Sequence, residues 1–158
     1  RDGGGIYSFG PSGTSTARLV ISGNYIKNAF RDPGGIYLDQ QTSHADVTGN
    51  ALNGVTDWIY INNNANNITT SGNISTTSAR TLSGSLGPNV VIGSGDPSVQ
   101  SASAVQASGI ATNAGVGSAY RGATSWVQGV PGGFAASAPN GSGPSVSITG
   151  GGTVGLKD

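Results

Sequence analysis

Two sets of short apolar runs alternate with each other along the first 80 residues of the chain. The first set reads Gly5-Ile6-Tyr7-Ser8, Gly35-Ile36-Tyr37-Leu38 and Trp58-Ile59-Tyr60-Ile61. The second set reads Leu19-Val20-Ile21-Ser22-Gly23-Asn24, Ala45-Asp46-Val47-Thr48-Gly49-Asn50 and Ile68-Thr69-Thr70-Ser71-Gly72-Asn73. The runs are bounded by Gly, Asn, Ser or Pro, and this pattern predicts β-strands joined by turns.

The runs recur at a repeat of 23 to 30 residues. The asparagines that end the second set are 26 and 23 residues apart, and the Ile-Tyr pairs of the first set are 30 and 23 apart. This spacing leaves no room for a crossover helix between the runs. The repeat therefore predicts the coils of an all-β parallel β-helix, or solenoid, in which each coil stacks on the next.

Stacking would place equivalent residues above one another and so predicts the core. The inward rows are Ile6, Ile36 and Ile59; Ser8, Leu38 and Ile61; Leu19, Ala45 and Ile68; and Ile21, Val47 and Thr70. Asn24, Asn50 and Asn73 each follow a Gly at a turn, where asparagine tolerates left-handed backbone. We expect these three amides to form a hydrogen-bonded ladder along the stack.

The second half of the chain has a different pattern. Residues 1–96 are assigned to the coils, with Asn89-Val90-Val91-Ile92 as a closing strand; residues 97–128 to a capping helix and its following segment; and residues 129–158 to a Gly-, Ser- and Pro-rich tail that holds one further strand at Ser145-Val146-Ser147-Ile148. Asp96 is the predicted N-cap of the helix, with Pro97 at its first position and Gly115 as its C-cap. A cap is expected because an open last coil exposes strand edges.

Composition excludes several classes of function. The chain has 28 Gly and only 9% charged residues, with seven Lys and Arg balancing seven Asp. A nucleic-acid partner would require a basic surface, which this balance does not supply. Without Cys the chain has no disulfide, thiolate zinc site or Cys nucleophile, and no apolar run is long enough to span a membrane. We expect a secreted, extracellular protein of bacterial type.

The phrases Ile21-Ser22-Gly23-Asn24-Tyr25-Ile26 and Gly34-Gly35-Ile36-Tyr37-Leu38-Asp39 resemble the final coils of right-handed parallel β-helix proteins of the pectate-lyase-like superfamily. The resemblance covers roughly residues 1–80. It implies a right-handed solenoid with a short C-terminal capping helix, and an activity on polysaccharides. In the glycoside hydrolases of this group, acids at the Asp-Gly-Gly-like turn and after the Ile-Tyr-Leu-like strand are candidate catalytic residues. Asp2, Asp32 and Asp39 match those positions, and Gln40 stands where many relatives have Glu.

The first set of strands also predicts a surface for a linear polysaccharide. Its outward rows are Gly5, Gly35 and Trp58; Tyr7, Tyr37 and Tyr60; and Phe9, Asp39 and Asn62. Glycines beside aromatic rings would leave a shallow trough in which the rings stack on sugars, although tyrosines in adjacent coils also stabilise each other.

Asp2 and Asp32 would lie about 5 Å apart in neighbouring coils. Retaining glycosidases place their two carboxyl groups about 5–5.5 Å apart and inverting ones about 6.5–9.5 Å apart. The leading hypothesis is a glycoside hydrolase of either kind that uses these two aspartates and Asp39. Arg31 could bind substrate, and His44 could be a base or a substrate contact.

Two alternatives to a hydrolase remain. One is a lyase, in which Lys27 and Arg31 neutralise a uronate. The other is a non-catalytic glycan-binding or structural solenoid of the tailspike or adhesin type. Aspartates at these turns could equally be turn caps. No cofactor is expected, and calcium at Asp32 and Asp39 has no supporting ligand spacing.

The repeat also predicts a partner. Three coils bury little surface, and the first coil would leave an unpaired β edge. We therefore expect this chain to dock on preceding coils, which come from the same precursor or from a separate subunit.

Overall fold

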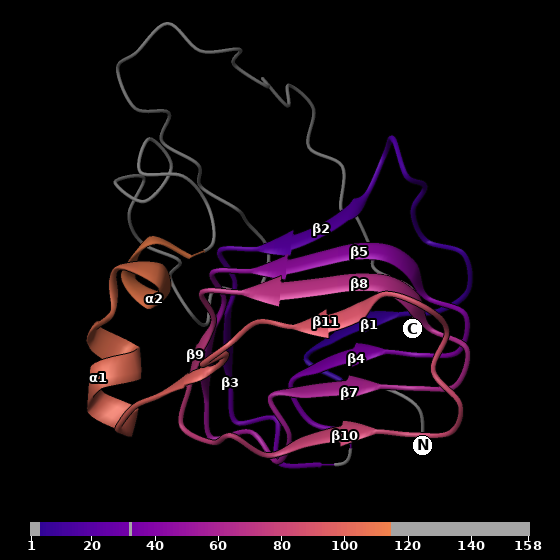
Figure 1. The fold of residues 1–158 in the computed structure, drawn as a ribbon. Helices are drawn as coiled ribbons and strands as arrows, with labels where there is room; N and C mark the ends of the chain where they lie inside the picture. Colours follow the sequence, from indigo (N-terminus) through magenta and orange to yellow (C-terminus); the bar gives the residue numbers. More distant parts are fainter. Residues whose placement is uncertain (1–3, 32, 115–158) are drawn as a thin grey trace, which may run out of the picture. The chain divides into compact units, whose positions relative to one another are not determined.

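The computed structural model describes residues 4–31 and 33–114, and predictions for Asp2, Asp32, Gly115 and the Gly-rich tail lie outside these residues. The described part contains twelve short strands in three parallel sheets and two short helices (Figure 1). The first sheet holds β1 (Ile6–Ser8), β4 (Ile36–Leu38), β7 (Ile59–Ile61) and β10 (Arg80–Leu82). The second holds β2 (Leu19–Ser22), β5 (Ser43–Thr48), β8 (Asn66–Ser71) and β11 (Val90–Ile92). The third holds β3 (Tyr25–Lys27), β6 (Ala51–Asn53), β9 (Ile74–Ser75) and β12 (Ser98–Val99).

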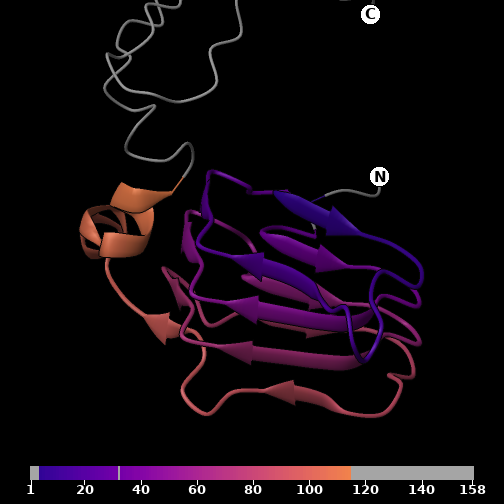
Figure 2. The same cartoon turned by 90° about the horizontal axis from the view of Figure 1, so that it is seen from above.

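The chain visits the three sheets in turn, so each coil consists of three strands. The first coil is β1, β2 and β3, and the last coil is β10, β11 and β12. Figure 2 shows the strands of successive coils stacked side by side. The prediction of an all-β parallel β-solenoid is therefore confirmed. The third sheet and strand β10 are additions that the sequence analysis did not identify.

The strand register agrees with the predicted rows. Ile6 pairs with Ile36 and Ile36 with Ile59, while Leu19 pairs with Ala45 and Ala45 with Ile68. The inward residues of the middle coils are fully buried; among them are Ile36, Leu38, Val47, Ile59, Ile61 and Ile68. Parallel pairing places residue on equivalent residue, so each row becomes a continuous apolar column in the core.

The row Gly5, Gly35 and Trp58 faces the core, which corrects its predicted outward position. A Cβ atom on Gly35 would overlap Leu52 Cδ2 and lie 2.9 Å from the Trp58 carbonyl oxygen, and the Trp58 side chain is 0% exposed. The third-sheet residues of the same three coils are Ile26, Leu52 and Ser75. Gly5 and Gly35 therefore share their coils with the large aliphatic residues Ile26 and Leu52. Trp58 shares its coil with the small Ser75, so a small residue in one row is matched by a large residue in the other.

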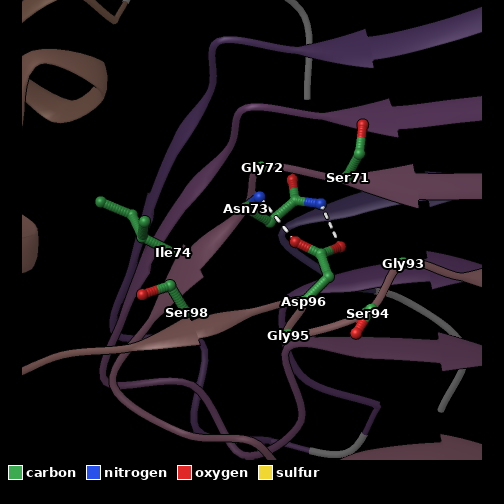
Figure 3. Close-up of a pocket in the computed structure, with 9 residues that line it drawn as sticks. All are labelled: Ser71, Gly72, Asn73, Ile74, Gly93, Ser94, Gly95, Asp96 and Ser98. Carbon is green, nitrogen blue, oxygen red and sulfur yellow. Dashed lines mark hydrogen bonds between the residues drawn. The ribbon is translucent and has the colours of Figure 1, made fainter.

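The predicted asparagine ladder is present and has a fourth member. Asn24 donates from Nδ2 to Asn50 Oδ1 at 2.9 Å, and Asn50 donates from Nδ2 to Asn73 Oδ1 at 2.9 Å. Asn73 donates from its backbone N and from Nδ2 to the two carboxylate oxygens of Asp96, at 2.7 and 2.8 Å (Figure 3). Asp96 is therefore the last rung of the ladder. It is not the helix N-cap that the sequence predicted.

The helices lie beside the third sheet (Figure 1). Helix α1 (Ala102–Ala107) is N-capped by Ser101 and contacts β6 and β9, and α2 (Gly109–Asn113) follows it. Val105 of α1 is fully buried, and Asn53 Nδ2 donates to the Ala102 carbonyl oxygen at 3.0 Å. The predicted start at Pro97 is wrong because Ser98–Val99 first extends the third sheet as β12. Helix α1 thus packs against the third sheet at its middle strands, β6 and β9.

Candidate functional site

Three tyrosines form a continuous column on the outer face of the first sheet. We call Tyr7, Tyr37 and Tyr60 the aromatic strip; they are in register on β1, β4 and β7. Neighbouring rings meet edge to face, with centroids 5.3 and 4.9 Å apart. Such pairs stabilise adjacent strands. The strip is most accessible at the first coil, where Tyr7 is 45% exposed and Phe9, which follows β1, is 63% exposed.

The Asp39 carboxylate lies behind this strip and is saturated with hydrogen bonds. Tyr7 Oη donates to Asp39 Oδ2 at 2.8 Å, while Asn62 Nδ2 and the Gln40 backbone N donate to Asp39 Oδ1 at 2.8 and 2.7 Å. Asn62 Nδ2 also donates to Tyr37 Oη at 3.2 Å. The structure thus brings together four of the predicted site residues, namely Tyr7, Tyr37, Asp39 and Asn62, in one network.

This network determines the charge of Asp39. Burial by itself would raise the pKa of Asp39, but hydrogen bonds from Asn62, Tyr37, Tyr7 and the Gln40 backbone outweigh burial and hold the pKa below its ordinary value. For Tyr37, burial and the neighbouring Asp39 carboxylate raise the pKa well above that of free tyrosine. At neutral pH the pair is an ionised carboxylate beside a protonated phenol, so Asp39 accepts hydrogen bonds and does not deliver a proton.

The remaining predicted site residues are dispersed. Asp2 and Asp32 lie outside the described residues, and Arg31 is exposed before β4. Trp58 is buried in the hydrophobic core, so its predicted contact with a sugar is wrong. His44 lies on β5 of the second sheet, on a different sheet from the aromatic strip.

His44 occupies an unusual backbone position. Its φ of 53° is left-handed, as is that of Asn67 at 52°, and the register of β5 on β8 aligns the two residues. His44 Nδ1 is buried and has no hydrogen-bond partner in the described part of the chain. A left-handed residue is uncommon inside a strand, and its recurrence at the aligned Asn67 indicates a structural role for His44 near the start of β5.

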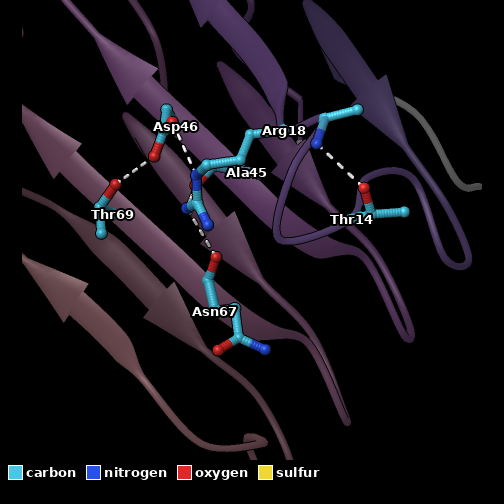
Figure 4. Close-up of polar contacts among 7 residues, drawn as sticks. Thr14, Arg18, Ala45, Asp46, Asn67 and Thr69 are labelled. Carbon is cyan, nitrogen blue, oxygen red and sulfur yellow. Dashed lines mark hydrogen bonds and ion pairs between the residues drawn. The ribbon is translucent and has the colours of Figure 1, made fainter.

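A second polar cluster lies on the outer face of the second sheet (Figure 4). Arg18 Nε donates to Asp46 Oδ2 at 2.7 Å, and Arg18 Nη2 donates to the Asn67 carbonyl oxygen at 2.9 Å. The hydrogen bond raises the pKa of Arg18 and lowers the pKa of Asp46. The cluster joins three consecutive coils. Because Asp46 also accepts from Thr69 Oγ1, its two carboxylate oxygens are both occupied.

Comparisons with known proteins add no assignment: no family model, no curated protein and no solved structure matches this chain. Within residues 4–31 and 33–114, no group of three or more His and Asp side chains gathers into a potential metal site. No helix in the described part is long and apolar enough to cross a bilayer. The solenoid fold is thus established by the structure, and the likeness to the pectate-lyase-like superfamily stays a sequence-based expectation.

Proposed function

We propose that this chain is a non-catalytic, extracellular glycan-binding solenoid of the tailspike or adhesin type. Its ligand is a linear polysaccharide that lies on the outer face of the first sheet. The observation that supports this proposal is the aromatic strip together with Phe9, because Tyr7 on β1 and Phe9 just after β1 are both exposed aromatic residues.

The strip has the properties of a preorganised binding surface. Tyr7 is held through its hydroxyl by Asp39 and through its ring by Tyr37. Fixing a side chain before binding reduces the entropy lost on association. The flat rings of Tyr7 and Phe9 suit the C–H faces of pyranose rings. Gln40, which is exposed and follows Asp39, can offer hydrogen-bonding groups to sugar hydroxyls.

The hydrogen bonds of the two described carboxylates Asp39 and Asp57 support a non-catalytic role. Glycosidases need one protonated acid and one ionised carboxylate. Asp39 is ionised and saturated with donors, and the buried Asp57 accepts from Thr81 Oγ1 at 2.6 Å. Neither is arranged to give a proton to a leaving group.

Binding can be measured by affinity electrophoresis in gels that contain defined neutral or uronic-acid polysaccharides. Tyr7→Ala and Phe9→Ala should each weaken retention, with Kd rising about tenfold, which corresponds to about 1.4 kcal/mol. Tyr7→Phe keeps the ring and should retain most of the binding. Val20→Ala is the matched control, because Val20 is 61% exposed on the second sheet. Equal retention of all four variants would refute the proposed surface.

A glycosidic hydrolase is the second candidate, favoured by the ionised state of Asp39. In that case Asp39 acts as base or nucleophile, and Asp2 or Asp32 supplies the acid. Release of reducing ends by the wild type, abolished in a folded Asp39→Asn variant, would establish the hydrolase and overturn the non-catalytic proposal. An unsaturated, ultraviolet-absorbing product would instead identify a lyase.

A further inference from the structure

The asparagine ladder has a direction. Asn24 and Asn50 each donate from the backbone N and from Nδ2 to the Oδ1 atom of the next coil. Asp96 ends the series with a carboxylate, which has no side-chain proton to donate, and its backbone N donates to the Gly93 carbonyl oxygen at 3.0 Å. At the other end, Asn24 Oδ1 accepts no hydrogen bond from any described residue. The ladder can therefore be extended before Asn24, whereas it stops at Asp96.

An apolar row of the core has the same direction. The row of Ile6, Ile36 and Ile59 ends at Arg80, which pairs with Ile59 and is exposed. In the first coil the corresponding position is Ile6, a half-buried residue packed against the core. The first coil thus presents an apolar residue and an amide acceptor, while the last coil presents a cation and a carboxylate at equivalent positions.

We propose that the edge of the first described coil is a docking surface for one further β-solenoid coil, the partner coil, which carries asparagine at the ladder position and an apolar residue at the Arg80 position. The partner's amide would donate to Asn24 Oδ1, and its apolar residue would cover Ile6. Parallel pairing of the strand edges would supply the backbone hydrogen bonds.

Another wild-type copy does not fit this description. Head-to-tail stacking would set the Asp96 carboxylate of one copy against Asn24 Oδ1 of the next, so that two acceptors meet without a proton between them. It would also bury Arg80 over Ile6 without a counter-ion. Asp96 and Arg80 therefore prevent copies of this chain from stacking end to end, as charged residues do at other sheet edges.

The test uses a variant of this chain whose last coil carries the two residues expected in the partner coil, an apolar residue at position 80 and asparagine at position 96. The double variant Arg80→Ile/Asp96→Asn should self-associate in a concentration-dependent way in sedimentation velocity, while the wild-type chain of 15.5 kDa should remain monomeric. Adding Ile6→Arg closes the docking surface of the variant itself. This triple variant should remain monomeric alone and form a one-to-one complex of doubled mass with the wild type.

Matched controls separate docking from loss of structure. Arg80→Lys/Asp96→Glu retains both charges and should stay monomeric, and wild type carrying Ile6→Arg should not bind the triple variant. Circular dichroism establishes that each variant is folded, and the single variant Asp96→Asn replaces any double variant that is not. Three results would each overturn the proposal. The folded triple variant could fail to bind wild type, wild-type chains could already stack end to end, or association could persist when both chains carry Ile6→Arg.

Discussion

Asp96 receives two hydrogen bonds from Asn73, one from the backbone and one from the side chain, and so takes the place in its coil that asparagine holds in the three coils before it. An aspartate suits only the last place. Asn50 and Asn73 each accept from the coil before and donate to the coil after, whereas the last residue needs only to accept. The replacement of the asparagine NH2 group by the second carboxylate oxygen of Asp96 thus marks the end of the ladder.

Exchanging the two residue types tests this relationship. Asn50→Asp would remove donors to Asn73 Oδ1 and to the Ile21 carbonyl oxygen and bury a carboxylate against both, and we expect it to lower the free energy of unfolding by about 3 kcal/mol or more. Asp96→Asn preserves an acceptor for Asn73 and should change stability by less than about 1 kcal/mol. Urea denaturation at neutral pH measures both, and equal effects would contradict the directional ladder.

Gly35 is expected to tolerate replacement poorly because it faces the core. Gly35→Ala places a methyl group against Leu52 Cδ2 and the Trp58 carbonyl oxygen, and overpacking of this kind costs about 1–3 kcal/mol. Gly109→Ala is the control: a Cβ there meets nothing within 4 Å, and alanine favours the helix. Thermal unfolding should show a lower Tm for the first variant and an unchanged or higher Tm for the second.

Stability should fall on acidification because of Asp39. Its folded-state pKa lies below the unfolded value of about 3.9, so the carboxylate stabilises the fold above that pH and loses its contribution as pH falls through the folded-state pKa. Asp46, whose pKa is lowered by its hydrogen bond with Arg18, should also lose its contribution to stability on acidification. Urea midpoints measured from neutral pH to about pH 2 should decline less steeply in Asp39→Asn than in the wild type. Parallel curves would show that Asp39 does not contribute.

Trp58 should report burial and not ligand binding. The chain has two tryptophans, so Trp126→Phe leaves Trp58 as the single emitter. Because its side chain is 0% exposed, its fluorescence should be blue-shifted, resistant to iodide quenching, and red-shifted on unfolding. A bound polysaccharide should leave this emission unchanged. Strong quenching by iodide in the folded protein would contradict the interior position.

The rows of the core were predictable because the fold repeats. In a parallel stack each coil pairs with equivalent residues of the next, so a sequence repeat directly gives the register, as Ile6, Ile36 and Ile59 illustrate. The asparagine ladder followed from the same repeat. The third sheet was missed because its strands are two or three residues long and do not alternate clearly.

The candidate site was predictable in its members but not in its chemistry. Period-two alternation placed Tyr7, Tyr37, Asp39 and Asn62 on one face, and they are in contact there. That Asp39 is buried and saturated with donors depends on how deeply the neighbouring tyrosines cover it, which only packing decides.

The sequence by itself determined which residues stack on which, because a repeated pattern and parallel pairing leave one consistent register. The tertiary structure decided whether the residues at the turns face the core or the solvent. Trp58 points inward although the next residue, Ile59, also faces the core, and Asp96 joins the ladder directly after the left-handed Gly95. Strict alternation holds only within a strand, so at the turns the packing of the three sheets decides where a side chain lies.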